Sequence, residues 1–572
     1  MHNNSFWTIL LVLMFPLLSL AQCDQQEWIR HFTAIAPTTT ALSSSIVNTV
    51  HSKVDGSWFW INGLAGQTIN QANVNSSIIQ CQPCASSKSI LIQKYDSEGG
   101  LIWSKFGCFG QELSVRGMTV DNQGNLIFGG YFRGELSYDG TLLGQSEVGF
   151  HSHYTMKVSS SGELLWFRDG YKSAAVFHTA TDQGVLLGLM VVDSTSYEGV
   201  TYYHSDPIGS QSNQTLIFLI DEDGHVIWNQ RIAGDGNRTI RNISCSASAC
   251  VIQGNYMDEI VYQGNTLSGG NNGKFFQLSI NPEQGDFQWM KKQLNSVTSV
   301  IVESAKIVSD SVLFSGGLYN GNSNPSEFAF QGTTISSSNG MTDGFIMKQN
   351  LNNGQLRWLK TLGAAGYSSV RGIAETVSGV VIDGFFTPQE LSFEGLTIFN
   401  HSENEDPFVI LLDHDGKPSC HLSDIGSSTR ELANNIWTLN DYQYLTVNFV
   451  DSVLLGQFNI GTNGNSQAVW KTCLPCDTLT SITETTQTQA ASLSIYPNTF
   501  STQCQLNYRT KQGARPTLQL TDMLGRRVQT IQLPNHEGRY TLDATALGTG
   551  IYFCSLISGA ELLATQKLVV SH

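Results

Sequence analysis

The sequence predicts an all-β protein built from repeated sheets, and three observations lead to that prediction. Of the 572 residues, 54 are Gly and only 14% are charged, a composition that suits many tight turns. A Gly followed four residues later by Trp recurs at spacings of 61 to 75 residues. Short apolar segments alternate with turn residues, and no stretch has a convincing helical period.

The recurring Gly and Trp mark one corner of each repeat. The Gly suits a hairpin turn that needs a positive φ, and the Trp is large enough to fill the space between neighbouring sheets. In the sixth copy Cys420 replaces Trp, and Trp28 occupies the same position near the start of the chain. The remaining pairs are Gly99 and Trp103, Gly162 and Trp166, Gly224 and Trp228, Gly285 and Trp289, and Gly354 and Trp358.

Each of seven units also supplies an apolar run that ends in small residues. Five aromatic-x-Gly hairpin signals and five strands just before the turn recur along the same units. About sixty residues of sheet cannot bury both faces alone, whereas radial stacking of such sheets buries them. The sequence therefore predicts a seven-bladed β-propeller. Because the last unit lacks its own Gly-to-Trp strand, we expect the N-terminal strand at Trp28 to complete the last blade.

Two segments of the repeats, "TVDNQGNLIFGG" (119–130) and "DGFIMK" (343–348), resemble the SBBP-type β-propeller repeat of exported bacterial proteins. The resemblance extends over residues 28–476, although unit 3 lacks the Asn and unit 7 lacks the Trp. It implies a fold and not an activity.

The ends of the chain suggest export. An apolar run from Thr8 to Leu20, followed by Ala21, predicts a signal peptide over residues 1–21, so the propeller spans 22–476. Residues 477–490 ("DTLTSITETTQTQA") read as a Thr-rich linker. Residues 491–572 contain about seven short alternating segments, which predict a small Ig-like β-sandwich.

Within this last segment, "SIYPN", "DMLGRRV" (522–528), "LGTGIYF" (547–553) and "QKLVV" (566–570) resemble the type IX secretion C-terminal sorting domain of Bacteroidota. The resemblance implies delivery to the outer cell surface or the extracellular space. It implies two partners, the type IX secretion machinery and a sortase-like peptidase that removes the domain. An ordinary binding sandwich is the alternative.

Eleven Cys in an exported chain predict disulfides. A bond from Cys23 to Cys473 or Cys476 would fasten the ring, and one between Cys245 and Cys250 would cross a tight turn. A four-thiolate zinc site from Cys81, Cys84, Cys473 and Cys476 is the less favoured alternative. A third candidate bond, between Cys504 and Cys554, would join the sheets of the sandwich.

Two patterns could hold a metal, but both have simpler readings. His151 and His153 are expected to be solvated on a polar loop. The D-x-D-G turns at 221–224 and 413–416 resemble oxygen-rich Ca²⁺ loops, but a turn supported by Asp side chains needs no ion. Since no protease, esterase or P-loop motif occurs either, we predict no catalytic, cofactor or metal site.

Arg116, Arg241 and Arg371 fall at the same point of units 2, 4 and 6, in "SVRG", "TIRN" and "SVRG". If that strand lines the central channel, three guanidiniums surround one mouth and favour an anionic ligand such as an acidic glycan. The alternative is that each Arg pairs with a local carboxylate. The net charge of −16 argues against general nucleic-acid binding, and no segment is apolar and long enough for a transmembrane helix.

The sequence thus favours an exported binding protein for a glycan or protein ligand. A polysaccharide-acting enzyme, a glycosidase or lyase, is the main alternative, and a structural protein of the surface or matrix is another. An enzyme of that kind needs two carboxyl groups about 5–10 Å apart in a cleft.

Overall fold

The computed structural model describes the chain except residues 1–27, 35–46, 66–70, 75–76, 81–87, 192–193, 204–213, 237, 270–272, 295–297, 322–324, 338–341, 365, 378, 388–389, 401–403, 423–424, 427–430, 440–441, 456–457, 473–491, 497–498, 501, 511–515, 523–525, 546, 559–560 and 572. The described residues form strands and turns and no helix, which confirms the predicted all-β fold. No membrane-crossing helix is therefore present among them. The predicted signal peptide and Thr-rich linker lie outside the described residues.

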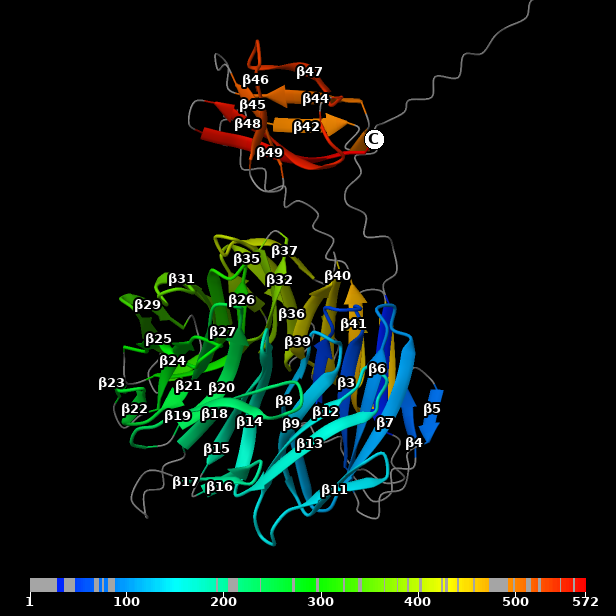
Figure 1. Ribbon diagram of the computed structural model, residues 1–572, viewed down its shortest axis with the longest axis vertical. Helices are drawn as coiled ribbons and strands as arrows, with labels where there is room; N and C mark the ends of the chain where they lie inside the picture. Colours follow the sequence, from blue (N-terminus) through cyan, green and yellow to red (C-terminus); the bar gives the residue numbers. More distant parts are fainter. Residues whose placement is uncertain are drawn as a thin grey trace, which may run out of the picture. The chain divides into compact units, whose positions relative to one another are not determined.

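The chain divides into two compact units, residues 1–479 and 480–572. In the larger unit, the described strands form seven successive sheets whose colours in Figure 1 follow the chain. The first strand of each sheet contacts the first strand of its neighbours, so these strands line the centre. They are β2 (Val47–His51), β8 (Glu112–Val120), β14 (Ser173–Thr181), β20 (Arg238–Cys245), β26 (Thr298–Val308), β32 (Tyr367–Thr376) and β39 (Glu431–Leu439).

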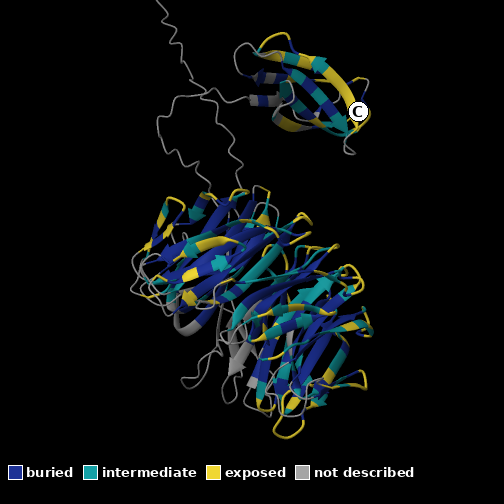
Figure 2. Cartoon of the chain, turned by 90° about the vertical axis from the view of Figure 1, so that its left-hand side faces the viewer, coloured by how far each residue is buried: buried dark blue, intermediate teal, exposed yellow. Residues whose placement is uncertain are grey.

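The second and third strands of each blade are apolar over most of their length because both of their faces pack against neighbouring blades. Figure 2 shows these strands as mainly buried and the turns as exposed. The second strands are β3 (Trp58–Ala65), β9 (Leu126–Arg133), β15 (Gly184–Val191), β21 (Cys250–Tyr256), β27 (Val312–Gly321), β33 (Gly379–Thr387) and β40 (Tyr442–Leu455). The third are β6 (Lys88–Tyr95), β12 (Ser152–Val158), β18 (Gln214–Ile220), β24 (Lys274–Ile280), β30 (Thr342–Asn350), β36 (Asp406–Asp413) and β41 (Phe458–Thr472).

The outermost strand of the last blade comes from the start of the chain. β1 (Trp28–Ala34) pairs antiparallel with β41, with Trp28 opposite Lys471, and so closes the ring as the sequence predicts. Figure 1 shows β41 beside strands from the start of the chain. The other outermost strands are β7 (Leu101–Phe109), β13 (Leu164–Tyr171), β19 (Val226–Ile232), β25 (Phe287–Lys292), β31 (Leu356–Ala364) and β37 (Pro418–Leu422). Together these strands make a seven-bladed β-propeller.

Short hairpins extend from the blades and lie against the outermost strand of the preceding blade, where they cover exposed sheet edges. In the last blade, the end of β40 next to the β40–β41 turn serves as this hairpin and pairs with β38 (Ile425–Gly426). The hairpins are β4 (Gln71–Val74) with β5 (Ser77–Gln80), β10 (Glu135–Tyr138) with β11 (Thr141–Gln145), β16 (Ser194–Tyr197) with β17 (Val200–Tyr203), β22 (Glu259–Tyr262) with β23 (Asn265–Ser268), β28 (Glu327–Phe330) with β29 (Thr333–Ser336), and β34 (Glu390–Phe393) with β35 (Leu396–Phe399).

The Gly and Trp of the repeat form the joint between blades. Each turn Gly has a positive φ, and a Cβ at Gly162, Gly224, Gly285, Gly354 or Gly416 would lie 2.6–3.2 Å from the Trp ring of the preceding blade. Glycine is therefore required for two reasons, the turn and the close approach of the ring. Four indole N–H groups donate to carbonyl oxygens in the next turn, Trp103 to Ser160 (3.0 Å), Trp166 to Glu222 (2.8 Å), Trp228 to Pro282 (3.3 Å) and Trp289 to Leu351 (2.7 Å).

The smaller unit is a β-sandwich around one apolar core. One sheet has the order β42 (Ser492–Tyr496), β44 (Gln503–Arg509), β47 (Glu537–Asp543). The other has the order β43 (Thr499–Phe500), β49 (Glu561–Val570), β48 (Gly550–Ser558), β45 (Thr517–Asp522), β46 (Arg527–Gln532).

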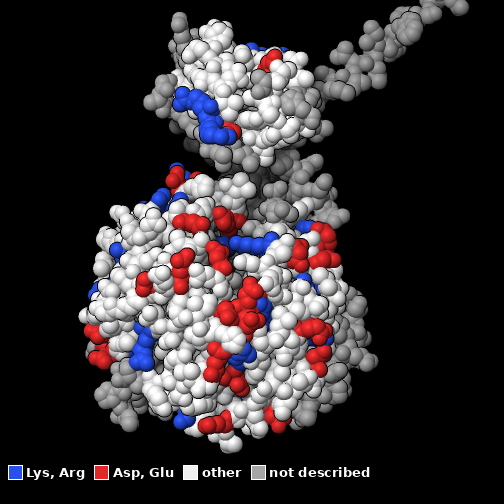
Figure 3. All heavy atoms as spheres, viewed as in Figure 1, with Lys and Arg blue, Asp and Glu red and all other residues white. Residues whose placement is uncertain are grey.

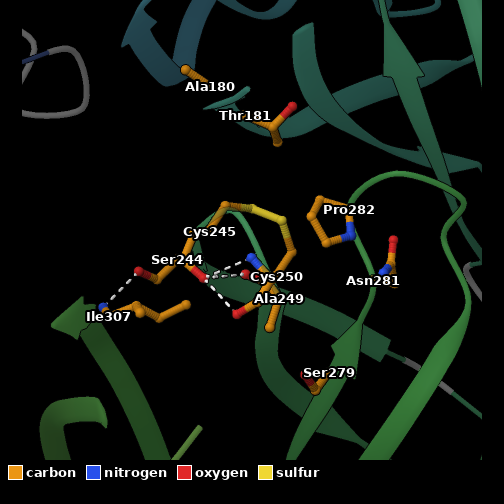
Figure 4. The surroundings of a disulfide bond; sticks show 12 residues. Ala180, Thr181, Ser244, Cys245, Ala249, Cys250, Ser279, Asn281, Pro282 and Ile307 are labelled. Atoms are coloured by element: carbon orange, nitrogen blue, oxygen red, sulfur yellow. Dashed lines mark hydrogen bonds between the residues drawn. A yellow bond between two sulfur atoms is a disulfide. The ribbon is translucent and has the colours of Figure 1, made fainter. Parts of the chain in front are cut away.

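The cysteines follow the predictions only in part. Cys245 and Cys250 form a disulfide across the β20–β21 turn, beside Ser244, whose hydroxyl accepts a bond from the Ile307 amide of the next blade (Figure 4). Cys108 is also disulfide-bonded. The three cysteines predicted to fasten the ring, Cys23, Cys473 and Cys476, lie outside the described residues.

The predicted bond between Cys504 and Cys554 is not formed in the structure. Both are free, buried thiols, on β44 and β48 of the two facing sheets. They belong to the same apolar core, where each packs as a small apolar side chain, and burial raises the pKa of both thiols. An inter-sheet bond is therefore not needed to fill this core.

Candidate functional site

A cavity of about 280 Å³ lies at the centre of the ring, and all seven blades contribute to its wall. Most of the lining residues come from the first strand of a blade. Arg116, Arg241 and Arg371, which the sequence singled out, all line this one cavity. The other lining residues are Thr49, Gly117, Met118, Phe177, His178, Asn242, Ile243, Glu303, Ser304, Asn435 and Thr446.

A repeated irregularity of the backbone explains why the three arginines meet. In blades 2 to 7 the register between first and second strands shifts by one residue at the same point, which is a β-bulge. A bulge leaves its extra residue out of the ladder and turns the side chain to a new direction. The described register of blade 1 is continuous. The bulged residues, in ring order, are Arg116, Val176, Arg241, Glu303, Arg371 and Asn434.

Glu303 shares this ring position but was not predicted from the sequence. It would have been found by aligning "VES" (302–304) of unit 5 with the "VRG" and "IRN" segments around the arginines. Glu303 is the acidic residue of the lining and forms an ion pair with Arg371, with 3.3 Å between the guanidinium nitrogen and the carboxylate oxygen. The alternative reading of local ion pairs therefore holds for Arg371.

The other two arginines have no carboxylate partner among the described residues. Arg241 is exposed and forms no hydrogen bond or ion pair with the described part of the chain. Arg116 is exposed and lies over the ring of Tyr131, with its guanidinium carbon 5.5 Å from the ring centroid. The guanidinium of Arg371 lies in the same way 5.1 Å from the centroid of Phe385. Two guanidiniums therefore remain available to an anion.

His178 adds no positive charge to the cavity. Burial lowers its pKa to about 3, and its Nε2 forms a hydrogen bond of 2.9 Å with the Thr155 hydroxyl. The ring lies so close to the first strand of blade 2 that a Cβ at Gly117 would be 2.9 Å from Nδ1 of His178. Three guanidiniums against one carboxylate leave the lining positively charged within a chain of net charge −16.

A second carboxyl group lies behind Arg371. Asp383 on β33 is fully buried, opposite Gly372 in the β32–β33 ladder, and is not a lining residue. Burial raises the pKa of Asp383 to about 8 against the opposing effect of Arg371. Neither of its oxygens, nor Nε of Arg371, has a hydrogen-bond partner in the part of the chain that the structure describes.

The two weaker metal patterns of the sequence are resolved differently. His151 and His153 are both on or beside β12, but His151 is exposed and bonded to Glu112, whereas His153 is fully buried and bonded to Ser173. The expectation that both are solvated is therefore wrong for His153, which lies within the fully buried strand β12, whereas His151 precedes that strand.

In the D-x-D-G turns, the first Asp accepts bonds from backbone amides of its own turn, as in a supported turn. Among the described residues, no group of three or more His, Cys, Asp or Glu side chains is placed to hold a metal ion.

The molecule is thus a propeller with a cationic central cavity and a separate C-terminal sandwich. Residues 494–571 match the family described as "Secretion system C-terminal sorting domain". The sandwich is therefore a type IX secretion sorting domain, and the chain is exported to the cell surface or the extracellular space. No curated protein matches the chain.

Comparison with solved structures gives only distant similarities. The quinohemoprotein alcohol dehydrogenase ADHIIG of Pseudomonas putida HK5 is 10% identical, with a TM-score of 0.32 and 73% of each chain covered. PorZ, a surface component of the type IX secretion system of Porphyromonas gingivalis, is 9% identical, with a TM-score of 0.20 and 92% of each chain covered. A fungal alcohol oxidase of the AA5 family is 9% identical, with a TM-score of 0.30, over 92% of this chain and all of that one. Overlaps this weak carry no argument about function.

Proposed function

We propose that this chain is an exported, non-catalytic binding protein whose propeller holds an acidic glycan at Arg116, Arg241 and Arg371. One observation carries the proposal: guanidiniums from three alternate blades line one cavity, and two of them lack a carboxylate partner among the described residues. Guanidinium groups bind carboxylate and sulfate groups through charge-assisted hydrogen bonds, which are about twice as strong as neutral ones.

The overall charge of the protein makes the location of these arginines significant. On the face of the larger unit shown in Figure 3, Asp and Glu are more numerous than Lys and Arg. An anion is repelled by such a surface and attracted only where cations gather. We therefore expect binding to be local to the cavity and to weaken as salt screens the charges.

The lining gives less support to an enzyme that cleaves polysaccharides. Such an enzyme needs two carboxyl groups that flank the reacting bond. Glu303 is the acidic group of the lining, and it is engaged by Arg371. The carboxyl group with a raised pKa, Asp383, is fully buried outside the cavity wall and out of reach of a substrate.

We further propose that a sortase-like peptidase removes the sandwich during export and leaves the propeller as the mature binding unit. The basis is the sorting domain at the end of the chain. Mass spectrometry of the exported protein tests this step, since a mature chain that ends before residue 491 is expected and an intact C-terminus contradicts it.

The experiment for binding is a glycan array probed with the wild-type chain and two charge-matched triple variants. In the first, Arg116, Arg241 and Arg371 are replaced by Ala, and binding to acidic glycans should be lost. The control replaces three arginines of the outermost strands by Ala: Arg168 on β13, Arg231 on β19 and Arg357 on β31. Binding that survives in the first variant, or is lost equally in both, would overturn the assignment of the site.

A further inference from the structure

Two further lysines, Lys306 and Lys53, lie on and just after the first strands of blades 5 and 1. Strand residues rise about 3.3 Å each, so a residue three positions beyond the bulge lies about 10 Å along the channel. Lys306 has that relation to Glu303 on β26, and His51 follows the lining residue Thr49 by two positions on β2. His51 stacks on Trp437 of the adjacent last blade, with ring centroids 6.2 Å apart.

The first strands of blades 5 and 1 lie on opposite sides of the channel, since at least two blades separate them in the ring. β26 belongs to blade 5 and contacts β20 and β32, whereas β2 belongs to blade 1 and contacts β8. Burial lowers the pKa of Lys306, and the charge of Lys53, just after β2, lowers it further. Burial also lowers the pKa of His51 to about 4, with contributions from Lys306 and Lys53. Lys306 lies two positions beyond the lining residue Ser304, and alternate residues of a strand share one face, so Lys306 is expected to project into the channel.

Lys306 has no ion-pair partner among the described residues. Lys306 forms no hydrogen bond or ion pair within the described part of the chain, and the acidic group that acts on it, Glu375, is exposed. A lysine held in a channel without a partner is costly to the fold unless something else supplies the negative charge. The arrangement therefore calls for an anion at this level in addition to the one at the arginines.

We propose that Lys306 and Lys53 form a second cationic subsite of the channel and that the ligand is a linear acidic polysaccharide long enough to reach both subsites. This inference rests on the function proposed above and specifies its ligand. A single small anion at the three arginines would leave Lys306, about 10 Å away, without a partner. Single-stranded nucleic acid is a poorer fit because its binding relies on exposed aromatic platforms, and the one aromatic residue of the lining, Phe177, is buried.

The test compares binding of galacturonic acid and of an oligogalacturonate to the full-length chain by isothermal titration calorimetry. The oligomer should bind wild type at least about tenfold more tightly than the monomer, since it gains one more charge-assisted contact. Lys306→Met should weaken oligomer binding about tenfold and leave monomer binding unchanged. Lys306→Arg, which keeps the positive charge, should bind the oligomer as tightly as wild type does. Lys417→Met, at an exposed turn, is the control for loss of a positive charge elsewhere.

The outcomes separate the two proposals. If the oligomer binds wild type no more tightly than the monomer, or if the Lys306→Met variant binds it as wild type does, the second subsite is wrong while the arginine site stands. If neither sugar binds a well-folded wild type, both proposals fail. Tighter binding of polyglutamate or of single-stranded DNA than of the oligogalacturonate would overturn the polysaccharide as ligand.

Discussion

Replacement of Gly354 by Ala tests the joint between blades most directly. Gly354 has a φ of 65°, and a Cβ there would lie 2.6 Å from the Trp289 ring of the preceding blade. Gly332, in the β28–β29 hairpin, is the matched control, because its φ is 85° but no atom lies within 4 Å of an added Cβ. Both substitutions force an L-residue into the left-handed region, but only the first also crowds a ring.

The two contributions predict different losses of stability. A left-handed conformation costs an L-residue about 1 kcal/mol, so Gly332→Ala should lower the free energy of unfolding by that amount. Overpacking against Trp289, which is 6% exposed, adds about 2 kcal/mol, so Gly354→Ala should lower it by about 3 kcal/mol. Combining Gly354→Ala with Trp289→Leu makes room for the methyl group, so the added cost of Gly354→Ala should fall to about 1 kcal/mol.

Equilibrium unfolding in guanidinium measures these differences. All eleven Trp precede residue 477, so tryptophan fluorescence reports on the propeller and not on the sorting domain. If Gly354→Ala and Gly332→Ala lower the free energy of unfolding equally, the proposed packing of Trp289 against Gly354 is wrong, because the turn conformation alone would then account for the glycine. The packing would also be wrong if the losses of Gly354→Ala and Trp289→Leu simply add in the double variant, since residues in contact are expected to couple.

Three other predictions concern buried or bonded groups. Folding raises the pKa of Asp383 from 3.8 to about 8, so the wild-type free energy of unfolding should fall as pH rises through that range. The slope is up to about 1.4 kcal/mol per pH unit, and Asp383→Asn should remove it, as measured by denaturant unfolding at a series of pH values. Cys504 and Cys554 should be alkylated only after unfolding, as mapped by mass spectrometry, and an unfolded chain that stays unlabelled would mean that they are bonded after all. Replacing Cys245 and Cys250 with Ser opens a loop with a sequence separation of 5 and should cost about 2 kcal/mol in guanidinium unfolding; no loss would contradict this.

The sequence predicted the features that repeat and missed those that occur once. The Gly–Trp spacing predicts the joints between blades because one packing problem recurs at each joint and has one solution. In the sandwich, seven alternating segments correspond to strands, but β43, with only two residues, is too short to leave a pattern. That Cys504 and Cys554 are not bonded could not be predicted either, because a sequence shows a cysteine but not whether its sulfur is a free thiol or part of a disulfide.

The arginine positions were predictable for the same reason, whereas their partners were not. Arg116, Arg241 and Arg371 occupy equivalent positions of the repeat, and an alignment of the units shows such positions without a structure. The partner of Arg371, Glu303, has the same position but a different residue type, so a search for a repeated residue passes over it. Lys306 is harder still to find, because its relation to Lys53 crosses from blade 5 to blade 1.

The bulges suggest how a repetitive scaffold acquires an irregular site. Bulged positions in the described first strands are occupied by Arg, Val, Glu and Asn, although the backbone shifts register at the same point each time. The extra residue of a bulge takes no part in the ladder, so the fold places few demands on its side chain. The Gly–Trp joints, in contrast, tolerate little change because a Cβ at the turn would enter the neighbouring ring. If the arginines bind the proposed ligand, stability and ligand choice depend on different positions of one repeat. Substitutions at Arg116 or Arg241 should then alter binding while leaving the unfolding midpoint nearly unchanged.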